Sequence, residues 1–195
     1  LCQEGSRHFA FAPEVKGWRW SRQLRAWLVA HVKEYDVVVL NGLWMLGRIG
    51  DREIWVINLF TGGITLLVSL RLALGAGADA ASIKAAAFSL LFSFTYLWVA
   101  FNRFSGADGR GLGWFSLFVA ITAVPVAIDT LVTSSSIWGT WFGLCWAAWA
   151  GLWFLFFLLL ALGKPLARLT AVTAIVQGVL TAWLPGYLLL TGVIA

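Results

Sequence analysis

The sequence predicts an all-α membrane protein, a six-transmembrane-helix bundle with an atypical first helix. Of its 195 residues, 61% are hydrophobic and only 12% are charged, whereas about a quarter of the residues of a soluble domain are charged. The mean hydropathy is +0.85. The apolar residues form long continuous stretches, several of them about 20 residues long, which is the length of a helix that crosses a bilayer. They do not alternate with polar residues as the strands of a membrane β-barrel do.

Residues 1–36 differ in composition from the rest of the chain, and we treat them as an atypical basic N-terminal segment. They contain Trp18, Trp20 and Trp27 among basic side chains, a mixture typical of an amphipathic helix on a membrane surface. A second interpretation is that this segment is not native to the membrane domain, which is then residues 37–195. The basic residues of the segment are Arg7, Lys16, Arg19, Arg22, Arg25 and Lys33.

Six apolar stretches are expected to form the spans. The first, residues 37–46, is about half as long as a span and follows the charged sequence HVKEYD, so the first helix is expected to be unusual. The remaining five are residues 54–74, 85–101, 114–132, 141–162 and 169–190.

The fifth stretch is unusually rich in tryptophan. Trp146, Trp149 and Trp153 are spaced so that they lie on one face of a helix. They extend over about 10 Å of helix at 1.5 Å per residue, so they cannot all lie at one membrane–water boundary. At least one indole N–H is then buried and needs a partner or a polar lumen. The stripe therefore indicates either a passage for a small polar solute or tryptophans packed between helices.

The loops predict the orientation of the helices. Basic residues are concentrated in the short loops that follow the first, third and fifth spans, and the positive-inside rule places such loops in the cytoplasm. Both termini are then outside, and three helical hairpins around a pore describe the bundle. The basic residues of these loops are Arg48, Arg52, Arg103, Arg110, Lys164 and Arg168.

Side chains with catalytic potential are scarce after residue 36. Both histidines, His8 and His31, precede that point, and Cys145 is the one cysteine beyond it. The glycine-rich run 106–113 lacks the Lys-Ser/Thr ending of a phosphate-binding loop, so we interpret it as a tight turn. The net charge of +5 does not indicate nucleic-acid binding, because the basic residues after residue 36 lie at span ends, where topology explains them. We expect no enzyme, no metal and no cofactor.

Several neutral polar residues lie inside the predicted spans, where they need hydrogen-bond partners. They can both donate and accept, which suits an uncharged amide or urea. Equally, they can join helices to one another, a common role in membrane bundles. Asp129 lies near the outer end of the fourth span and is either solvated or part of a vestibule. The neutral residues are Asn41, Asn58, Thr95, Gln177 and Thr181.

Six sequence blocks resemble the AmiS/UreI family of urea and short-chain amide channels, in order and with matching spacing over residues 37–192. The blocks are NGLWMLGRI (41–49), INLFTGG (57–63), FTYLWVAFN (94–102), GLGWFSLFVAI (111–121), WAAWAGLWFLFF (146–157) and AIVQGVLTAWLP (174–185).

The resemblance implies six-helix protomers, each with its own pore, assembled as a homo-hexamer in the bacterial inner membrane. It also implies two aromatic-lined constrictions that pass urea-like solutes, and a functional link to a cytoplasmic amidase or urease. By position, Gln177 falls where the acid-gated urea channel has glutamate. The residues that match the pore positions of the family are Asn41, Phe94, Trp98, Trp146, Trp149, Trp153 and Gln177.

Two departures from the family pattern shape the functional hypothesis. The charged HVKEYD replaces the first half of helix one. The membrane body also lacks histidine, and the loop between spans four and five is short and uncharged, so we expect a pore that is not acid-gated. The hypothesis is passive diffusion of urea or short-chain aliphatic amides. The alternatives are an active amide carrier and a non-transporting membrane scaffold or sensor.

Overall fold

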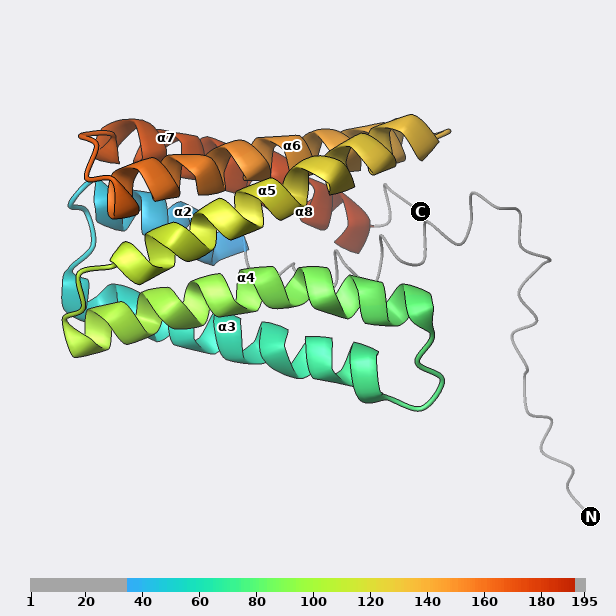
Figure 1. Ribbon diagram of the computed structural model, residues 1–195, viewed down its shortest axis with the longest axis horizontal. Coiled ribbons are helices and arrows are strands. Elements are labelled where there is room, and N and C mark those ends of the chain that lie inside the picture. Colours follow the sequence, from blue (N-terminus) through green and yellow to red (C-terminus); the bar gives the residue numbers. More distant parts are fainter. Residues whose placement is uncertain (1–34, 192–195) are drawn as a thin grey trace, which may run out of the picture.

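The computed structural model describes residues 35–191, and every regular element in this range is helical (Figure 1). The interpretations of residues 1–34 lie outside the described part of the chain. The elements are α2 (Tyr35–Met45), α3 (Asp51–Leu74), α4 (Ala80–Ser105), α5 (Arg110–Thr133), α6 (Ile137–Phe156), the π-helix η1 (Phe157–Ala161), α7 (Ala167–Gln177), the π-helix η2 (Gly178–Trp183) and α8 (Leu184–Leu190).

Five segments are long and apolar enough to cross a membrane, and they confirm the second to sixth predicted spans. All five begin earlier than predicted, and in α4 and α6 a polar side chain caps the first turn. Asp79 and Ser82 form a capping box, in which the Asp79 side chain accepts from the Ser82 backbone N–H at 2.8 Å. The described part of the first span, α2, has 11 residues, which is about half the length that a bilayer requires.

The helices pack as three pairs around the centre of the bundle. The most extensive contacts are between α3 and α4, between α5 and α6, and between α2 and α7. The turns that carry the basic loop residues join helices of different pairs, at the left in Figure 1. The tightly packed hairpins, α3–α4 and α5–α6, are therefore connected at the other end of the bundle. The third pair joins α2 and α7, which lie near the two ends of the membrane domain.

Small residues explain this choice of partners, because they allow two helix backbones to approach closely in a membrane. The Ser93 hydroxyl of α4 donates to the Gly62 carbonyl of α3 at 2.8 Å. A side chain at Gly42 of α2 would meet the Ala171 carbonyl of α7 at 2.7 Å, and one at Gly143 of α6 would meet Leu131 of α5. Each pair thus contains a contact that only glycine permits.

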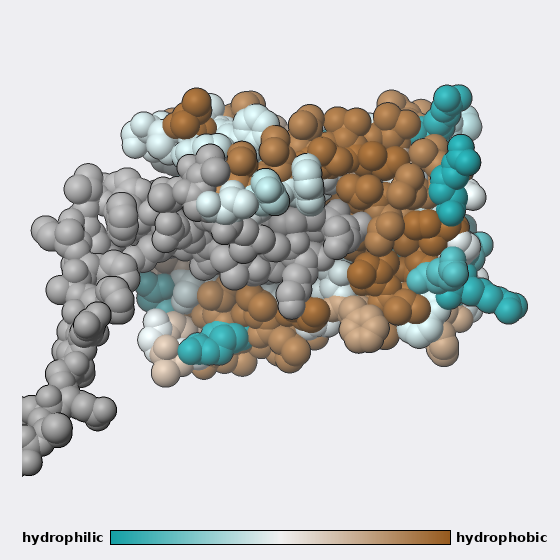
Figure 2. Space-filling model, turned by 180° about the vertical axis from the view of Figure 1, so that it is seen from behind, coloured by the Kyte–Doolittle hydropathy of each residue, from teal (hydrophilic) through white to brown (hydrophobic). Residues whose placement is uncertain are grey.

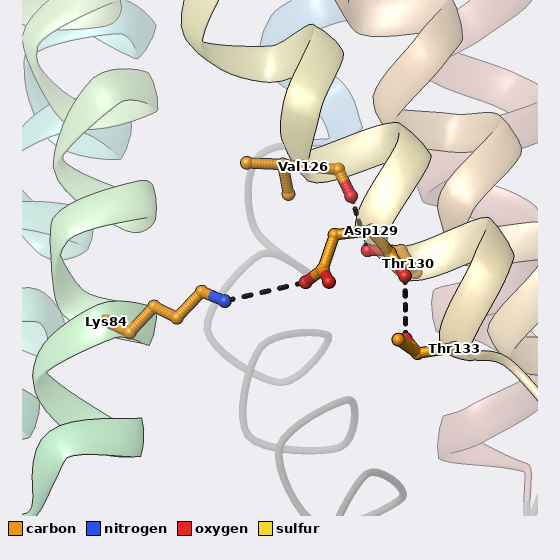
Figure 3. A network of polar contacts seen from close by, with 5 residues as sticks. All are labelled: Lys84, Val126, Asp129, Thr130 and Thr133. Atoms are coloured by element: carbon orange, nitrogen blue, oxygen red, sulfur yellow. Dashed lines mark hydrogen bonds and ion pairs between the residues drawn. The ribbon is translucent and has the colours of Figure 1, made fainter.

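The two ends of the bundle differ in charge. The space-filling view in Figure 2 shows hydrophobic side chains along the bundle and hydrophilic ones gathered at the end where α2, α4 and α6 turn. At the opposite end, Lys84 of α4 and Asp129 of α5 form an exposed ion pair of 3.7 Å (Figure 3). The hydroxyls of Thr130 and Thr133 donate to backbone carbonyls of the preceding turn. Asp129 therefore belongs to an exposed ion pair between helices.

The Gly62 contact leads to a stability prediction. A methyl group at Gly62 would lie 2.7 Å from Leu97 Cγ and 3.0 Å from the Leu97 backbone nitrogen, whereas one at Gly63 would meet nothing within 4 Å. Gly62→Ala should therefore destabilise the protein by about 1–3 kcal/mol through overpacking, measured as a lower unfolding temperature in detergent. Gly63→Ala is the matched control, with no loss expected because alanine favours helix. Equal losses in both variants would contradict this account of the α3–α4 contact.

Candidate functional site

A cavity of about 80 Å³ lies between the helix pairs. A single water needs roughly 10–15 Å³ by this kind of measure, so the cavity has room for a solute of several water-sized groups. α2, α4, α5, α6 and the α7–η2 segment contribute its wall. The lining residues are Val38, Asn41, Trp44, Met45, Phe92, Thr95, Tyr96, Val99, Leu112, Ser116, Trp149, Leu152, Trp153, Phe156, Ala174, Gly178, Thr181 and Ala182.

Aromatic rings of α4 and α6 form one side of the cavity. The Phe92 ring lies 5.1 Å from the Trp149 ring in an edge-to-face arrangement and 4.8 Å from the Trp153 ring, measured between centroids. Aromatic pairs prefer such tilted geometries at these distances. The rings therefore hold one another in place and present a stiff surface to the cavity.

The buried indole N–H groups of this wall have partners on other helices. Trp149 Nε1 donates to Thr181 Oγ1 of η2 at 2.8 Å, and Trp153 Nε1 donates to Thr95 Oγ1 of α4 at 3.3 Å. The Thr181 hydroxyl in turn donates to the Gln177 carbonyl, and the Thr95 hydroxyl donates to the Leu91 carbonyl. The tryptophans are thus fixed between helices, and they also border the cavity.

The backbone changes from an α-helix to a π-helix in the turn that contains Thr181. Pro185 has no backbone N–H to donate to the carbonyl four residues back, which is that of Thr181. The preceding turn is the π-helix η2, in which the Leu184 N–H donates to the Val179 carbonyl. The Cys145 thiol approaches the Thr181 carbonyl at 4.0 Å. A local π-helix of this kind is frequent at functional sites.

Asn41 lies in the cavity wall and is paired with Asn58. Asn41 Nδ2 donates to Asn58 Oδ1 at 3.0 Å, and Asn58 Nδ2 donates to Asn41 Oδ1 at 2.7 Å. Asn58 also donates to the Ile54 carbonyl and is fully buried. An asparagine amide has two N–H donors and two acceptor lone pairs. The two bonds to Asn58 therefore orient Asn41 and leave it one donor and one acceptor.

The structure separates the predicted site residues into three groups. Asn41, Trp149 and Trp153 border the cavity. Trp146 is buried behind them in edge-to-face contact with Phe88 and Trp149.

The remaining predicted residues are not among those that line the cavity. Gln177 donates through Nε2 to the Ala148 carbonyl at 3.0 Å, and its Oε1 is buried without a partner in the described structure. Phe94 and Trp98 have exposed fractions of 45% and 37%, and the Trp98 ring also packs 5.5 Å from the Phe115 ring of α5. The physical reason is the helical period, because positions 94 and 98 are about half a turn from 92 and 96.

Phe92, Tyr96 and Trp44 are wall residues that sequence reasoning missed. Phe92 and Tyr96 are spaced four apart, as Phe94 and Trp98 are, so spacing alone does not distinguish the two stripes. The available signal was Ser89 and Ser93, because small polar residues mark the face of a membrane helix that packs against protein. Both serines are buried.

Charged groups do not contribute to the described wall of this cavity. Within residues 35–191, histidine, cysteine and carboxylate side chains also form no cluster that could hold a metal ion. The arrangement is suited to a neutral molecule that has a flat face and hydrogen-bonding groups.

Comparison with known proteins identifies relatives along most of the chain. It is 43% identical over 157 residues to a proposed amidate substrates transporter of Mycolicibacterium smegmatis. This alignment covers 80% of this chain and 72% of the relative. It is 33% identical over 178 residues to the acid-activated urea channel of Helicobacter pylori. This alignment covers 78% of this chain and 91% of that channel.

The fold agrees with these relatives. The crystal structure of the Helicobacter pylori urea channel superposes with a TM-score of 0.77 at 32% identity, and covers 87% of this chain and 99% of that one. The relatives are transporters and not enzymes, as the sequence predicted. Residues 35–193 match the model of the AmiS/UreI family transporters, and the chain therefore belongs to the AmiS/UreI family.

Proposed function

We propose that the protein is a passive channel for urea and short-chain aliphatic amides. One observation carries this proposal: the wall of the central cavity combines a stiff aromatic side with an asparagine amide held by a second asparagine. Relatives named as a urea channel and as a proposed amidate substrates transporter support the same class of solute.

The chemistry of the wall matches such solutes. Urea and acetamide are small, planar and neutral, and their flat faces can slide along the rings of Phe92, Trp149 and Trp153. The free donor and acceptor of Asn41 can replace two of the hydrogen bonds that a solute makes to water. Because the rest of the wall is largely apolar, binding is weak, and a solute that enters can also leave.

Ions are rejected by the same arrangement. A charged solute would lose its hydration in a cavity whose described lining carries neither charges nor ordered rings of carbonyls. The described wall residues also include no carboxylate that could bind a coupling proton or sodium ion. Passive diffusion down a concentration gradient does not require such a coupling carboxylate.

Two alternatives make different demands on the structure. A carrier with alternating access typically has unwound helices at its binding site, whereas α7, η2 and α8 follow one another without a break. A non-transporting scaffold would pack Trp149 and Trp153 with no lumen, but both border the cavity. Both observations favour the channel.

The same proposal includes orientation, location and assembly. With the basic end of the bundle in the cytoplasm, both termini are outside the bacterial inner membrane. Phe94, Trp98 and Phe101 form an exposed aromatic face on α4, which suits contact with lipid or with another protomer of a homo-hexamer. A cytoplasmic amidase or urease would consume the imported solute. Native mass spectrometry of the purified protein tests the assembly.

The aromatic wall leads to a transport prediction with a matched pair of variants. In proteoliposomes, Phe92→Ala should change urea and acetamide flux severalfold because it removes a ring that touches both cavity tryptophans. Phe94→Ala, two residues away on the outer face, should leave the flux of an assembled channel unchanged. Solute-driven swelling measures both. The opposite pattern would show that the outer stripe of α4 lines the pore.

The asparagine pair leads to a second prediction. Asn41→Leu together with Asn58→Leu removes both amides without leaving either one buried and unpaired, so the protein should remain folded. Each solute hydrogen bond of about 1 kcal/mol corresponds to a roughly fivefold effect, so losing one or both of the Asn41 bonds corresponds to a roughly five- to thirtyfold effect. Urea flux should fall by about this factor, while Asn58→Leu alone should have an intermediate effect. Unchanged urea flux in the double variant would exclude Asn41 as a solute ligand.

Gating leads to a third prediction. Histidine is absent from residues 35–191, and the described lining has no acidic group. We therefore expect the same urea flux at pH 5 and pH 7, measured by swelling of proteoliposomes equilibrated at each pH. A steep rise between pH 7 and pH 5 would contradict a pore without an acid gate. Linear dependence of flux on solute concentration would also separate a channel from a saturable carrier.

A further inference from the structure

Trp44 lies in the cavity wall at its basic end, where the transport proposal assigns it no role. It belongs to the last turn of α2, and its neighbours in the wall include Met45, also from the end of α2, and Phe156 from the end of α6. These residues lie at the end of the cavity nearest the basic turns.

The end of α2 fixes the position of Trp44 through its backbone. Gly47 has a φ of +74°, which favours glycine. Its N–H donates to the Trp44 carbonyl at 2.8 Å, and the Arg48 N–H donates to the Leu43 carbonyl at 2.9 Å. This pair of bonds is a Schellman motif, which ends the helix and turns the chain sharply. The turn leads to α3, whose first residue is Asp51.

Two charged side chains hold the Trp44 indole from the water side. Asp51 Oδ1 accepts from Trp44 Nε1 at 2.7 Å. The Arg103 guanidinium lies 5.2 Å from the centre of the Trp44 ring and 3.8 Å from the same Asp51 oxygen. The three residues come from α2, α3 and α4, and we call them the Trp44 clasp.

The helix termini favour these charges at these positions. Asp51 lies in the first turn of α3 and Arg103 in the last turn of α4, where a negative and a positive charge respectively interact well with the helix dipoles. A cation close to an aromatic face is also attracted to it. The Asp51 side chain is 72% exposed and that of Arg103 is 27% exposed. The clasp therefore joins a wall residue of the cavity to groups in contact with water.

We propose that Trp44 is a specificity-determining ring at the basic mouth of the cavity, and that Asp51 and Arg103 are the positioning residues that keep it in the path. This inference rests on the proposed channel function and extends it to the shape of the solute. A planar amide with a short chain passes along the face of the ring, whereas a branched acyl group collides with it. The clasp thus limits the size of the alkyl group that a permeant amide can carry.

The test compares two amides in proteoliposomes that contain the full chain. The measured quantity is the ratio of isobutyramide flux to acetamide flux, because a selectivity ratio does not change when the amount of active protein changes. Trp44→Ala should raise this ratio at least threefold by removing the ring. Asp51→Ala should raise it in the same direction by releasing the ring, and Asp51→Asn, which keeps an acceptor for the indole N–H, should give a smaller increase.

Asp108→Ala is the matched control at the same end of the bundle. Asp108 is an exposed carboxylate paired with Arg110 at 2.7 Å. The backbone N–H and the guanidinium of Arg110 lower the pKa of the Asp108 carboxyl. It is not among the described residues that line the cavity, so its loss should leave the flux ratio unchanged.

The possible outcomes distinguish failure of this inference from failure of the proposed channel function. If the wild-type protein passes neither urea nor acetamide, the channel proposal fails. If the wild type conducts but Trp44→Ala and Asp51→Ala keep its flux ratio, Trp44 does not select solutes and the inference is overturned. If Trp44→Ala does not assemble, the exposed Asp51 variants decide, because an unchanged ratio in Asp51→Ala overturns the positioning role.

Discussion

Polar groups inside the bilayer must be paired within the protein, and the rest of this structure depends on that constraint. The indole N–H of Trp149 bonds to Thr181, and that of Trp153 bonds to Thr95. These two bonds tie α6 to η2 on one side and to α4 on the other. Because the tryptophan rings are held at these positions, the helices enclose a cavity with a defined aromatic wall.

In the channel that we propose, the same constraint explains how the site can conduct without trapping its solute. Most polar atoms of the wall are already bonded to protein, so few of them remain to bind a solute. Asn41 is a partial exception, since its pairing with Asn58 uses only half of its hydrogen-bonding groups. A neutral amide therefore finds an oriented donor and acceptor beside apolar rings. In the proposed channel, such a site would select a solute by its shape and bind it only weakly.

The ends of the helices complete this design. Glycine contacts bring the helices together as pairs, and the turns at the basic end connect one pair to the next. Where α2 ends at the Gly47 turn, the Trp44 ring meets a carboxylate and a guanidinium from two other helices. Charges that stabilise helix termini thus also contact a residue of the cavity wall.

The sequence by itself determined the fold class, the location of five spans, the basic turns and the tryptophan stripe of α6. Each of these depends on local composition or on spacing within one helix. Only the tertiary structure decided that Phe92 and Tyr96 face the cavity while Phe94 and Trp98 face outward, that Asn41 pairs with Asn58, and that Trp44 meets Arg103. The physical reason is that a membrane helix is apolar on its lipid face as well as on its protein face. Hydrophobic periodicity therefore cannot distinguish inside from outside, and the contacts between helices must do so.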